Sequence, residues 1–489
     1  MRRRFPVASI WLPMALLGAL AVRLYGIDRS LWLDEFSTLW CVEEGWRAIA
    51  SRVAAFQGQT PLYYYAARLS IDVFGESEVA LRLPSLLASA GTALFCAMAA
   101  YLLAGRAAGI WAGMFAWLAF AHVQTGVNAR PYALALLGVA AAIAGVVGAG
   151  TIGHTRWRLL FIAGTVVAFW AHFAITLGIL GAAAGLALPA VRTRYTLRRL
   201  AVDGLAIAAL CAPAWPYLWA SVGRTHHGDW LPSPQHGDSA LLLAPLVLPV
   251  ALVLTGRHGE FAPVERVLLW AIAAPIVLIE LAWFTTGMNL VTARYLGQIV
   301  APAAVLAGVC AVRLTAPERR LAAVSFLAIT CGSYVQTWRA TGSASGLGVE
   351  DWRTAVAEAR HLLGERPALV LYRSGFREED LPPLGQPPPA TRSPLRGPGD
   401  LPFPPGVASL THTWQVAGRR RYFEEHLRPR VANAGRVIVL SQRAGLAEGN
   451  YADLTAEWCR QVLGEDSLVN SIPAGRGIDL RLVTQSDAR

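Results

Sequence analysis

Charged residues are scarce in this chain, and lysine is absent from it. Only 15% of the 489 residues are charged, whereas 55% are hydrophobic. Soluble domains average about 25% charged residues. The apolar residues occur in blocks, and the blocks are long enough for the roughly 20 residues of helix that cross a bilayer. We therefore expect a polytopic α-helical membrane protein rather than a soluble domain.

The positive charge does not indicate a nucleic-acid partner. The net charge is +11, and all 43 basic residues are arginines. Many of them lie in short connections between apolar blocks, which is the topology signal of membrane proteins and not a basic patch for nucleic acid. The six cysteines are scattered, with no CxxC pair or metal-ligand spacing. A disulfide between Cys41 and Cys459 is an alternative to two free thiols.

The apolar runs predict eleven spanning helices. These runs lie near residues 7–26, 82–103, 107–125, 132–150, 158–173, 174–191, 198–218, 239–256, 264–284, 295–313 and 319–336. Segment 61–75 is also apolar, but it is short and is interrupted by Arg68 and Asp72. We expect an interfacial helix there. For the first run, a cleaved signal peptide is the alternative.

The arginine-rich connections predict the orientation. Short loops that contain several arginines alternate with loops that contain few, and the positive-inside rule places the arginine-rich set in the cytoplasm. With eleven spans the N-terminus is then cytoplasmic, residues 27–81 form the first external loop, and the C-terminus lies outside. The abundance of arginine and alanine is typical of a GC-rich bacterium, so we expect a multi-pass protein of the bacterial inner membrane.

From about residue 340 the pattern is that of a soluble domain. Two strands are predicted at residues 368–376 and 436–444, and two amphipathic helices at 351–364 and 451–464. A proline-rich loop separates them, at residues 381–405. We expect a transmembrane domain over residues 1–339 and a small periplasmic α/β domain over residues 340–489, which is a normal domain size.

Acidic and basic side chains gather where the spans meet the outer face. Asp34 and Glu35 follow the first span among aromatic residues that hold a segment at the interface. Adjacent residues point in different directions, so the two carboxylates are expected to have different roles. Arg82, Arg130 and Arg294 lie at outer ends of spans. A solvated turn is the simpler explanation of the two carboxylates. For each arginine, the simpler explanation is snorkelling to the interface or pairing with a carboxylate.

One carboxylate and several arginines are enough for glycosyl transfer from a lipid phosphate. A hydroxyl that attacks an anomeric carbon needs a base to take its proton. The departing phosphate needs positive charge, which guanidinium groups supply through paired hydrogen bonds. Nothing on the outer face resembles a P-loop, so a nucleotide donor is not indicated.

The sequence resembles the GT-C glycosyltransferases of the dolichyl-phosphate-mannose–protein mannosyltransferase and aminoarabinose transferase type. The matching pieces are LWLDEFST in the first external loop, residues 59–87, VQTGVNARPYALALL, TARYLGQIVAP and the DWR that opens the C-terminal domain. The resemblance covers the membrane part well and the C-terminal part loosely. It implies a polyprenyl-phosphate sugar donor and inverting hexosyl or pentosyl transfer on the periplasmic face, to a hydroxyl of a lipid, glycan or protein acceptor.

The resemblance also implies roles for charged residues. Asp34 is expected to be the catalytic base, and Glu35 to position the base or the acceptor. Arg130 and Arg294 are expected to bind the donor phosphate. Arg82 either joins them or is structural.

Tyrosine and histidine side chains complete the expected site. Tyr132 and Tyr295, each beside one of these arginines, are expected to line the substrate pocket. His172 either contacts the sugar or a metal, or is a buried histidine with satisfied hydrogen bonds. Many relatives carry an acidic residue shortly after the second-loop arginine, and NARPYALALL has none, so a divalent metal is left open. Three other histidines are irregularly spaced for zinc and are better explained by a solvated loop, at His226, His227 and His236.

A transporter or flippase of a lipid-linked saccharide is the alternative function. It would carry charged groups deep inside spans, around broken helices. Asp203 and Glu280 are the candidates, and both lie nearer the ends of their segments. A non-catalytic assembly protein is a further alternative, because the external domain permits partner binding, but it gives no reason for acidic and basic groups on one face.

Overall fold

The computed structural model of the chain describes most of its residues. They are residues 8–54, 59–188, 194–225, 246–254, 261–286, 293–341, 350–373, 407–410, 420, 423–443, 445–446 and 449–485. The chain divides into two compact units. The larger comprises Met1–Asp28 and Gly45–Gly346, and the smaller comprises Arg29–Glu44 and Leu347–Arg489.

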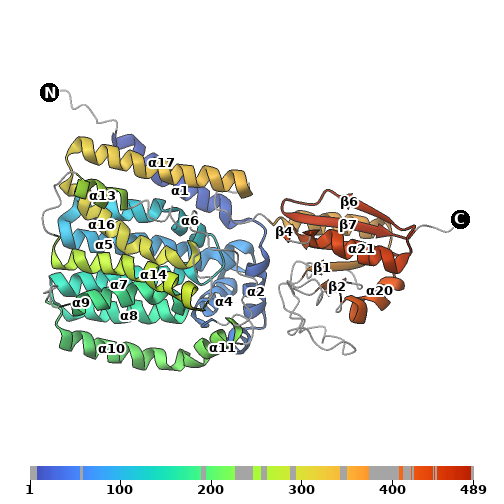
Figure 1. Ribbon diagram of the computed structural model, residues 1–489, viewed down its shortest axis with the longest axis horizontal. Helices are drawn as coiled ribbons and strands as arrows, with labels where there is room; N and C mark the ends of the chain where they lie inside the picture. Colours follow the sequence, from blue (N-terminus) through green and yellow to red (C-terminus); the bar gives the residue numbers. More distant parts are fainter. Residues whose placement is uncertain are drawn as a thin grey trace. The chain divides into compact units, whose positions relative to one another are not determined.

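The larger unit is a bundle of helices (Figure 1). Its elements are α1 (Ala8–Ile27), α3 (Trp46–Arg52), α4 (Leu62–Phe74), α5 (Glu78–Leu118), α6 (Phe120–Gly126), α7 (Tyr132–Thr151), α8 (Thr155–Ala171), η2 (Phe173–Thr176), α9 (Leu177–Ala187), α10 (Leu197–Cys211), η3 (Ala212–Ala214), α11 (Trp215–Thr225), α13 (Val247–Leu254), α14 (Pro263–Thr286), α15 (Ala293–Leu296), η6 (Gly297–Ile299), α16 (Val300–Arg313) and α17 (Ala316–Thr341). Helices α7 and α16 are buried along most of their length. They form the centre of the core, where α7 packs on α8 and α16 packs on α5.

The helices at the centre pack with their backbones in contact. A Cβ atom at Gly145 of α7 would lie 2.4 Å from the backbone nitrogen of Phe161 in α8, and one at Gly138 would lie 2.5 Å from that of Ala168. Without a hydrophobic force between helices in lipid, such small residues allow the close approach that dispersion needs. The glycine and alanine content of α7 therefore determines how closely α8 packs on it.

The predicted helical membrane class is confirmed, but the count of eleven spans is not. In the described part of the chain, five helices are long and apolar enough to cross a membrane, namely Glu78–Leu118, Tyr132–Thr151, Leu197–Ala220, Pro263–Thr285 and Arg294–Arg313. Leu17–Ile27 and Phe173–Ala187 are shorter apolar helices. The predicted spans 82–103 and 107–125 lie in α5 and α6. Non-helical backbone at Ala104 and Gly105 divides α5 into two helices, which pack against each other where Gly109 and Gly113 approach Ala97. A hydropathy pattern alone does not reveal how each run is broken into helices.

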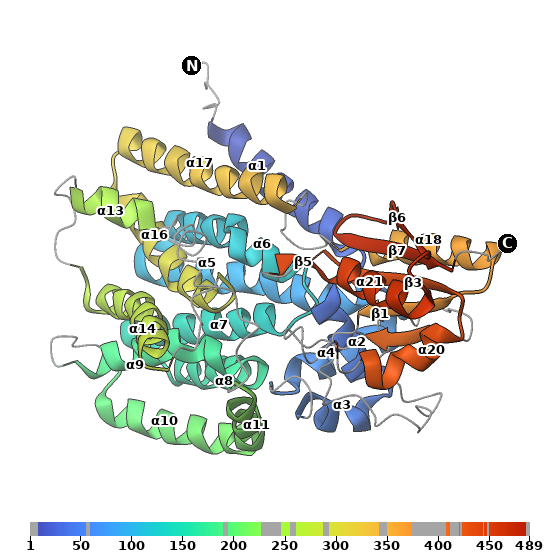
Figure 2. The same ribbon diagram turned by 45° about the vertical axis from the view of Figure 1, so that its right-hand side comes forward.

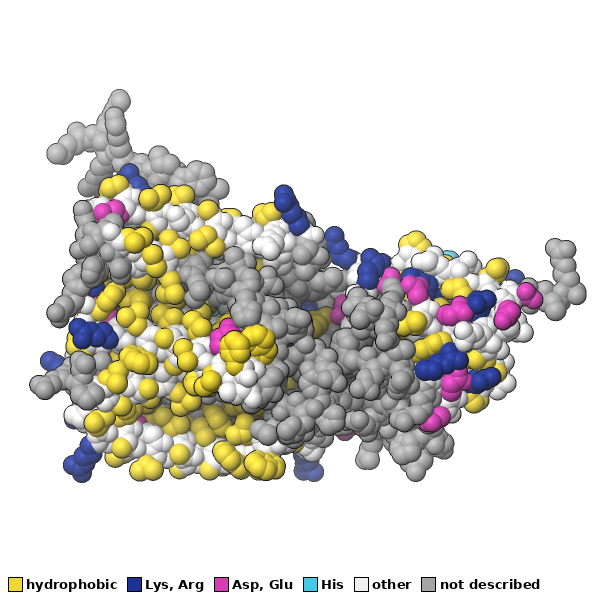
Figure 3. Space-filling view, viewed as in Figure 1, with side chains coloured by type: hydrophobic (Ala, Val, Ile, Leu, Met, Phe, Trp, Pro, Cys, Tyr) yellow, Lys and Arg dark blue, Asp and Glu magenta, His cyan; other side chains and the backbone are white. Residues whose placement is uncertain are grey.

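The outer surface of the bundle is apolar. Figure 3 shows hydrophobic side chains spread over the visible face of the bundle. Leu94 is 71% exposed, Leu205 73% and Phe284 75%. Apolar patches of this extent are unfavourable in water, so this surface is suited to contact with lipid.

A break between α5 and α6 lies inside the bundle. It leaves the carbonyl groups of residues 116–118 without helical partners, and no water is available there to replace them. Three side chains from other positions donate to these carbonyls: His122 Nδ1 to Ala116 at 3.1 Å, Arg23 Nη2 to Trp117 at 2.8 Å, and Tyr334 Oη to Leu118 at 3.3 Å. Arg23 is fully buried, with its guanidinium 3.8 Å from the centre of the Trp117 ring. These contacts stabilise the break that leads into the turn before α7.

The smaller unit is an α/β fold (Figure 2). Its elements are α2 (Leu33–Glu43), α18 (Trp352–Glu365), β1 (Leu369–Arg373), β2 (Val407–Leu410), η9 (Phe423–Leu427), α20 (Arg428–Ala432), β3 (Arg436–Gln442), β4 (Gly445–Leu446), β5 (Gly449–Asn450), α21 (Tyr451–Leu463), β6 (Leu468–Ile472) and β7 (Ile478–Thr484). The main sheet has the order β2-β1-β3-β7-β6, parallel from β2 to β3 and antiparallel from β3 to β6. The predicted strands and both amphipathic helices are present. The predicted proline-rich loop lies outside the described residues.

Helices cover both faces of this sheet. Ile438 and Leu440 of β3 face α18 and pack with Trp352. Side chains alternate along a strand, and on the opposite face Arg481 of β7 donates to Asp453 of α21 at 2.6 Å. The unit thus has its own core.

Helix α2, from the first external loop, belongs to this smaller unit. Phe36 packs against the same core as Trp352. The sequence-based domains, 1–339 and 340–489, assign that helix to the membrane part, so the contacts divide the chain differently at this point. Cys41 and Cys459, both buried in this unit, form no disulfide in the described part of the chain, so the alternative of a disulfide between them is wrong.

Candidate active site

Four of the expected site residues form one cluster in the larger unit. Arg130 lies in the turn before α7, Tyr132 is the first residue of α7, His172 follows α8, and Tyr295 lies in α15. The Tyr132 and His172 rings are stacked with their centroids 5.2 Å apart. The Tyr295 ring meets both edge-on, with centroids 6.5 Å and 5.6 Å away. Packing of three separate parts of the chain therefore builds one aromatic wall beside an arginine.

Hydrogen bonds hold the backbone of Arg130 in place. Its N–H donates to the carbonyl of Asn128 at 2.7 Å, and its own carbonyl accepts from Ser85 Oγ at 3.4 Å. Ser85 Oγ is in turn 2.9 Å from the hydroxyl of Tyr63, which is buried in α4. The Arg130 side chain is only 7% exposed. Burial and a fixed backbone hold Arg130 in place, and its binding of the donor phosphate stays a prediction.

His172 is buried without hydrogen bonds to its ring. Only 3% of the residue is exposed, and within the described ranges neither Nδ1 nor Nε2 has a hydrogen-bond partner. The expectation of a buried histidine with satisfied hydrogen bonds therefore does not fit. Leaving a buried polar atom unpaired costs about 1–3 kcal/mol, and a contact of His172 with a sugar or a metal stays a prediction. The positively charged Arg130 is also close enough to act on the His172 ring electrostatically.

Gln298 fixes the segment that carries Arg294 and Tyr295. Its Nε2 donates to the carbonyls of Tyr295 at 2.9 Å and Ala174 at 3.2 Å, and its Oε1 accepts from the N–H of Gly178 at 2.7 Å. The amide thus joins α15 to η2 and α9. It is fully buried, and its three bonds hold the Tyr295 ring beside His172.

Arg82 binds the end of another helix. Its Nη1 donates to the carbonyls of Ile27 at 2.9 Å and Gly26 at 3.4 Å, at the C-terminus of α1. Arginine commonly satisfies terminal helix carbonyls in this way. Arg82 therefore has a structural role at the end of α1, which was one of the two expectations for it. A contact of Arg82 with substrate stays a prediction.

The two carboxylates begin α2 in the smaller unit and have different surroundings. Glu35 is fully buried, and its Oε2 accepts from the backbone N–H of Trp32 at 3.3 Å, as in a helix capping box. Asp34 is half-buried. Glu35 thus stabilises the start of the helix, and Asp34, in the same turn, retains access to solvent. That the carboxylates of Asp34 and Glu35 share one site with Arg130 and Arg294 stays a prediction.

The described residues offer no protein-built metal cage. Among them, no three His, Cys, Asp or Glu side chains are grouped so that they could hold an ion. The histidine-rich loop with His226, His227 and His236 lies outside the described ranges.

Three structural contributors were not among the predicted site residues. Gln298 lies between α15 and α16 and interrupts an apolar run of the sequence. An isolated amide in such a run is a detectable signal. Arg23 lies inside the first apolar run, which is also detectable. Ser85 gives no such signal, because a small hydroxyl is common in membrane helices.

The backbone of this chain is similar to that of the aminoarabinose transferase ArnT from Cupriavidus metallidurans. The apo crystal structure gives a TM-score of 0.58 and 13% sequence identity, over 97% of this chain and 98% of that chain. The structure bound to undecaprenyl phosphate gives a TM-score of 0.56 and 14% identity, over 99% of both chains. No protein-family model and no curated protein matches the sequence.

The chain has the GT-C fold of ArnT. The predicted fold class, a helical membrane domain with a small C-terminal α/β domain, is thereby confirmed, and so is the GT-C resemblance at the level of fold. A shared fold does not transfer the roles of residues.

Proposed function

We propose that this protein transfers a sugar from a polyprenyl-phosphate donor to an acceptor hydroxyl. The observation that carries the proposal is the cluster of the buried Arg130, Tyr132 and His172 with the partly buried Tyr295 ring, in a chain with the fold of ArnT. ArnT has been crystallised with undecaprenyl phosphate. Aromatic faces suit the apolar side of a sugar ring, and a buried guanidinium suits a phosphate.

The reaction assigns one role to each group. The Asp34 carboxylate takes the proton of the acceptor hydroxyl as its oxygen attacks the anomeric carbon. The bond from that carbon to the phosphate oxygen breaks, its electron pair stays on the phosphate, and the configuration inverts. Arg130 and Arg294 stabilise the departing anion. Glu35 holds the helix turn that presents Asp34.

The face of the membrane follows from the arginines. Arg130 and Tyr132 lie where α7 begins, and Arg158 lies near the start of α8, close to where α7 ends. The positive-inside rule makes that second end cytoplasmic. The site and the C-terminal unit then lie on the periplasmic side of a bacterial inner membrane, where polyprenyl-linked sugars are available and nucleotides are not.

Variants test the donor site and the base separately. Undecaprenyl phosphate binding to the purified chain should weaken at least tenfold in Arg130→Gln, because a buried charge-assisted contact is lost. The matched control is Arg47→Gln, an exposed arginine in the first external loop. Asp34→Asn should still bind the lipid but leave the sugar unused on its carrier in a complemented deletion strain. Normal glycans with Asp34→Asn would exclude Asp34 as the base, and unchanged lipid binding by Arg130→Gln would exclude the donor site.

The transporter alternative has less support. Asp203, its main candidate, is occupied by two bonds to Arg158, the Nε contact being 2.8 Å, and by a bond from the Tyr195 hydroxyl. A carboxylate held this way acts as a structural anchor between α8 and α10. Uptake of a lipid-linked saccharide into vesicles without any acceptor would favour transport instead.

A further inference from the structure

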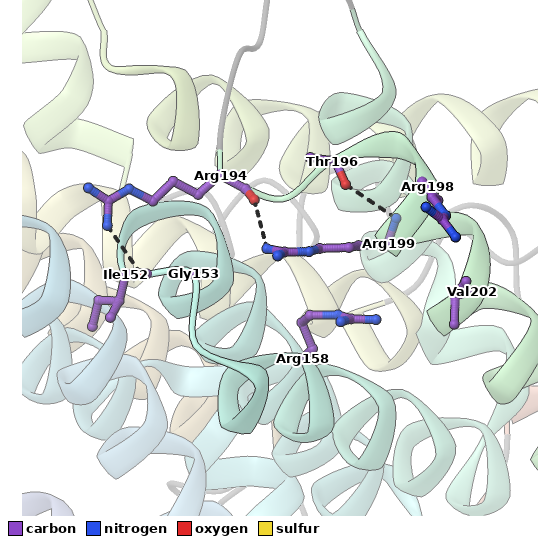
Figure 4. Close-up of a pocket in the computed structure, with 8 residues that line it drawn as sticks. All are labelled: Ile152, Gly153, Arg158, Arg194, Thr196, Arg198, Arg199 and Val202. Atoms are coloured by element: carbon purple, nitrogen blue, oxygen red, sulfur yellow. Dashed lines mark hydrogen bonds between the residues drawn. The ribbon is translucent and has the colours of Figure 1, made fainter.

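A basic cavity lies at the end of the bundle opposite to the candidate active site. It has a volume of about 810 Å³, and four arginines line it together with Ile152 and Val202, namely Arg158, Arg194, Arg198 and Arg199 (Figure 4). Arg158 comes from α8, Arg194 from the segment before α10, and Arg198 and Arg199 from the first turn of α10. Helix α7 has 20 residues, so its two ends are roughly 30 Å apart. The cavity therefore lies near one membrane surface and Tyr132 near the other.

The charge in the cavity is not neutralised by the described protein. Arg158 is paired with Asp203. Within the described residues, the side chains of Arg194 and Arg199 donate only to backbone carbonyls, those of Ile152 at 3.2 Å and of Arg194 at 3.4 Å respectively. Arg198 makes no hydrogen bond or ion pair within the described ranges. Three like charges thus share one cavity, and their mutual repulsion is relieved by a bound anion.

An apolar strip on α10 continues from the cavity. Val202, which lines the cavity, is 53% exposed, and Leu205, one helical turn further along, is 73% exposed. Side chains three residues apart are neighbours on a helix surface. A ligand that joined an anionic head to apolar chains would contact both the arginines and this strip, whereas a soluble anion would contact the arginines alone.

We propose that this cavity binds the phosphate headgroup of an anionic membrane lipid. The shared chemistry is a phosphate ester gripped by guanidinium groups. The exposed strip of Val202 and Leu205 favours a membrane lipid over free phosphate as its source. Basic pockets between membrane helices bind such headgroups in general. The site is separate from the proposed donor site and serves a different lipid.

The test is lipid binding to the purified full chain in a neutral detergent. Phosphatidylglycerol, phosphatidylcholine and inorganic phosphate are titrated separately, and bound lipid is counted by native mass spectrometry. Phosphatidylglycerol should bind at least tenfold more tightly than phosphatidylcholine. Arg198→Gln with Arg199→Gln should remove that difference and leave binding of undecaprenyl phosphate unchanged. Arg198→Gln alone, which removes no described contact, should reduce the preference for phosphatidylglycerol at least threefold. This single variant replaces the double variant in the test if the double variant fails to fold.

The matched control is Arg106→Gln. Arg106 is an exposed arginine next to the break within α5, and it does not line the cavity. It should keep the preference for phosphatidylglycerol. Equal binding of the two lipids, an undiminished preference in Arg198→Gln and the double variant, or an equal loss in Arg106→Gln would each overturn the proposal. If millimolar inorganic phosphate displaced bound phosphatidylglycerol as effectively as added phosphatidylglycerol does, the ligand would be a free anion. That result would also overturn the proposal.

Discussion

Adding one methyl group at Gly145 should destabilise the bundle and disturb the candidate site together. The new Cβ atom would lie 2.4 Å from the backbone nitrogen of Phe161 and 2.7 Å from its Cα. Ordinary contact begins near 3.4 Å, so α8 must move about 1 Å away from α7. Both neighbours are backbone atoms, and no change of rotamer relieves the clash. Overpacking of this kind costs about 1–3 kcal/mol.

That displacement reaches the site because the same two helices carry its rings. Tyr132 begins α7 and His172 follows α8, and their centroids are 5.2 Å apart. A shift of about 1 Å weakens a stacked contact appreciably, since dispersion falls steeply with separation. Gly145→Ala should therefore lower both the melting temperature and the affinity for undecaprenyl phosphate.

The assay is thermal unfolding of the purified chain in detergent, with lipid binding measured on the same sample. Gly332→Ala is the matched control, because a Cβ at this position of α17 meets nothing within 4 Å. Alanine is favoured over glycine in a helix by about 1 kcal/mol, so the control should melt at the same temperature or higher. A Gly145→Ala protein as stable as the control would refute the close α7–α8 packing.

Further substitutions test single contacts. His172→Phe keeps the aromatic wall but removes both ring nitrogens, so stability should hold or rise while transfer falls at least tenfold; unchanged transfer would return His172 to a structural role. Gln298→Leu removes three bonds that position Tyr295 and should reduce donor binding more than it reduces expression, which a binding titration checks. Arg23→Leu leaves the Trp117 carbonyl unpaired in the bundle, so the melting temperature should drop, whereas Arg106→Leu should not lower it. Burial raises the pKa of the Cys459 thiol to about 12, so it stays neutral at pH 8, and maleimide should modify it only after unfolding, as intact-mass measurement would show.

The helices and strands were largely predictable because they depend on local patterns. The apolar runs, the period of residues 451–464 and the alternation at 436–444 reflect burial of one face or of the whole segment. The number of spans was not predictable in the same way. Within α5 the backbone breaks at Ala104 and Gly105, the run near 174–191 divides into η2 and α9, and a further break separates α5 from α6. The carbonyls at that last break accept hydrogen bonds from the distant side chains of Arg23 and Tyr334.

Members of the candidate site could be selected from the sequence, but their arrangement could not. A tyrosine beside each of two arginines gave a reason to select Tyr132 and Tyr295, and in the structure both rings contact His172, while their roles stay predictions. The contact of Arg82 with α1 joins positions that are distant in sequence, and so do two of the three hydrogen bonds of Gln298. No local sequence pattern could therefore predict these contacts.

The sequence by itself determined that this is a helical membrane protein with a C-terminal α/β part, because hydropathy and periodicity are properties of neighbouring residues. Only the tertiary structure decided that helix α2 packs with the C-terminal unit and that the described residues give the buried His172 ring no hydrogen bond. It also decided that four arginines line a cavity near the end of α7 and the start of α8, where, in the described part of the chain, only Arg158 has an acidic partner. Those features depend on which distant surfaces meet, and that is settled by the packing of the whole chain.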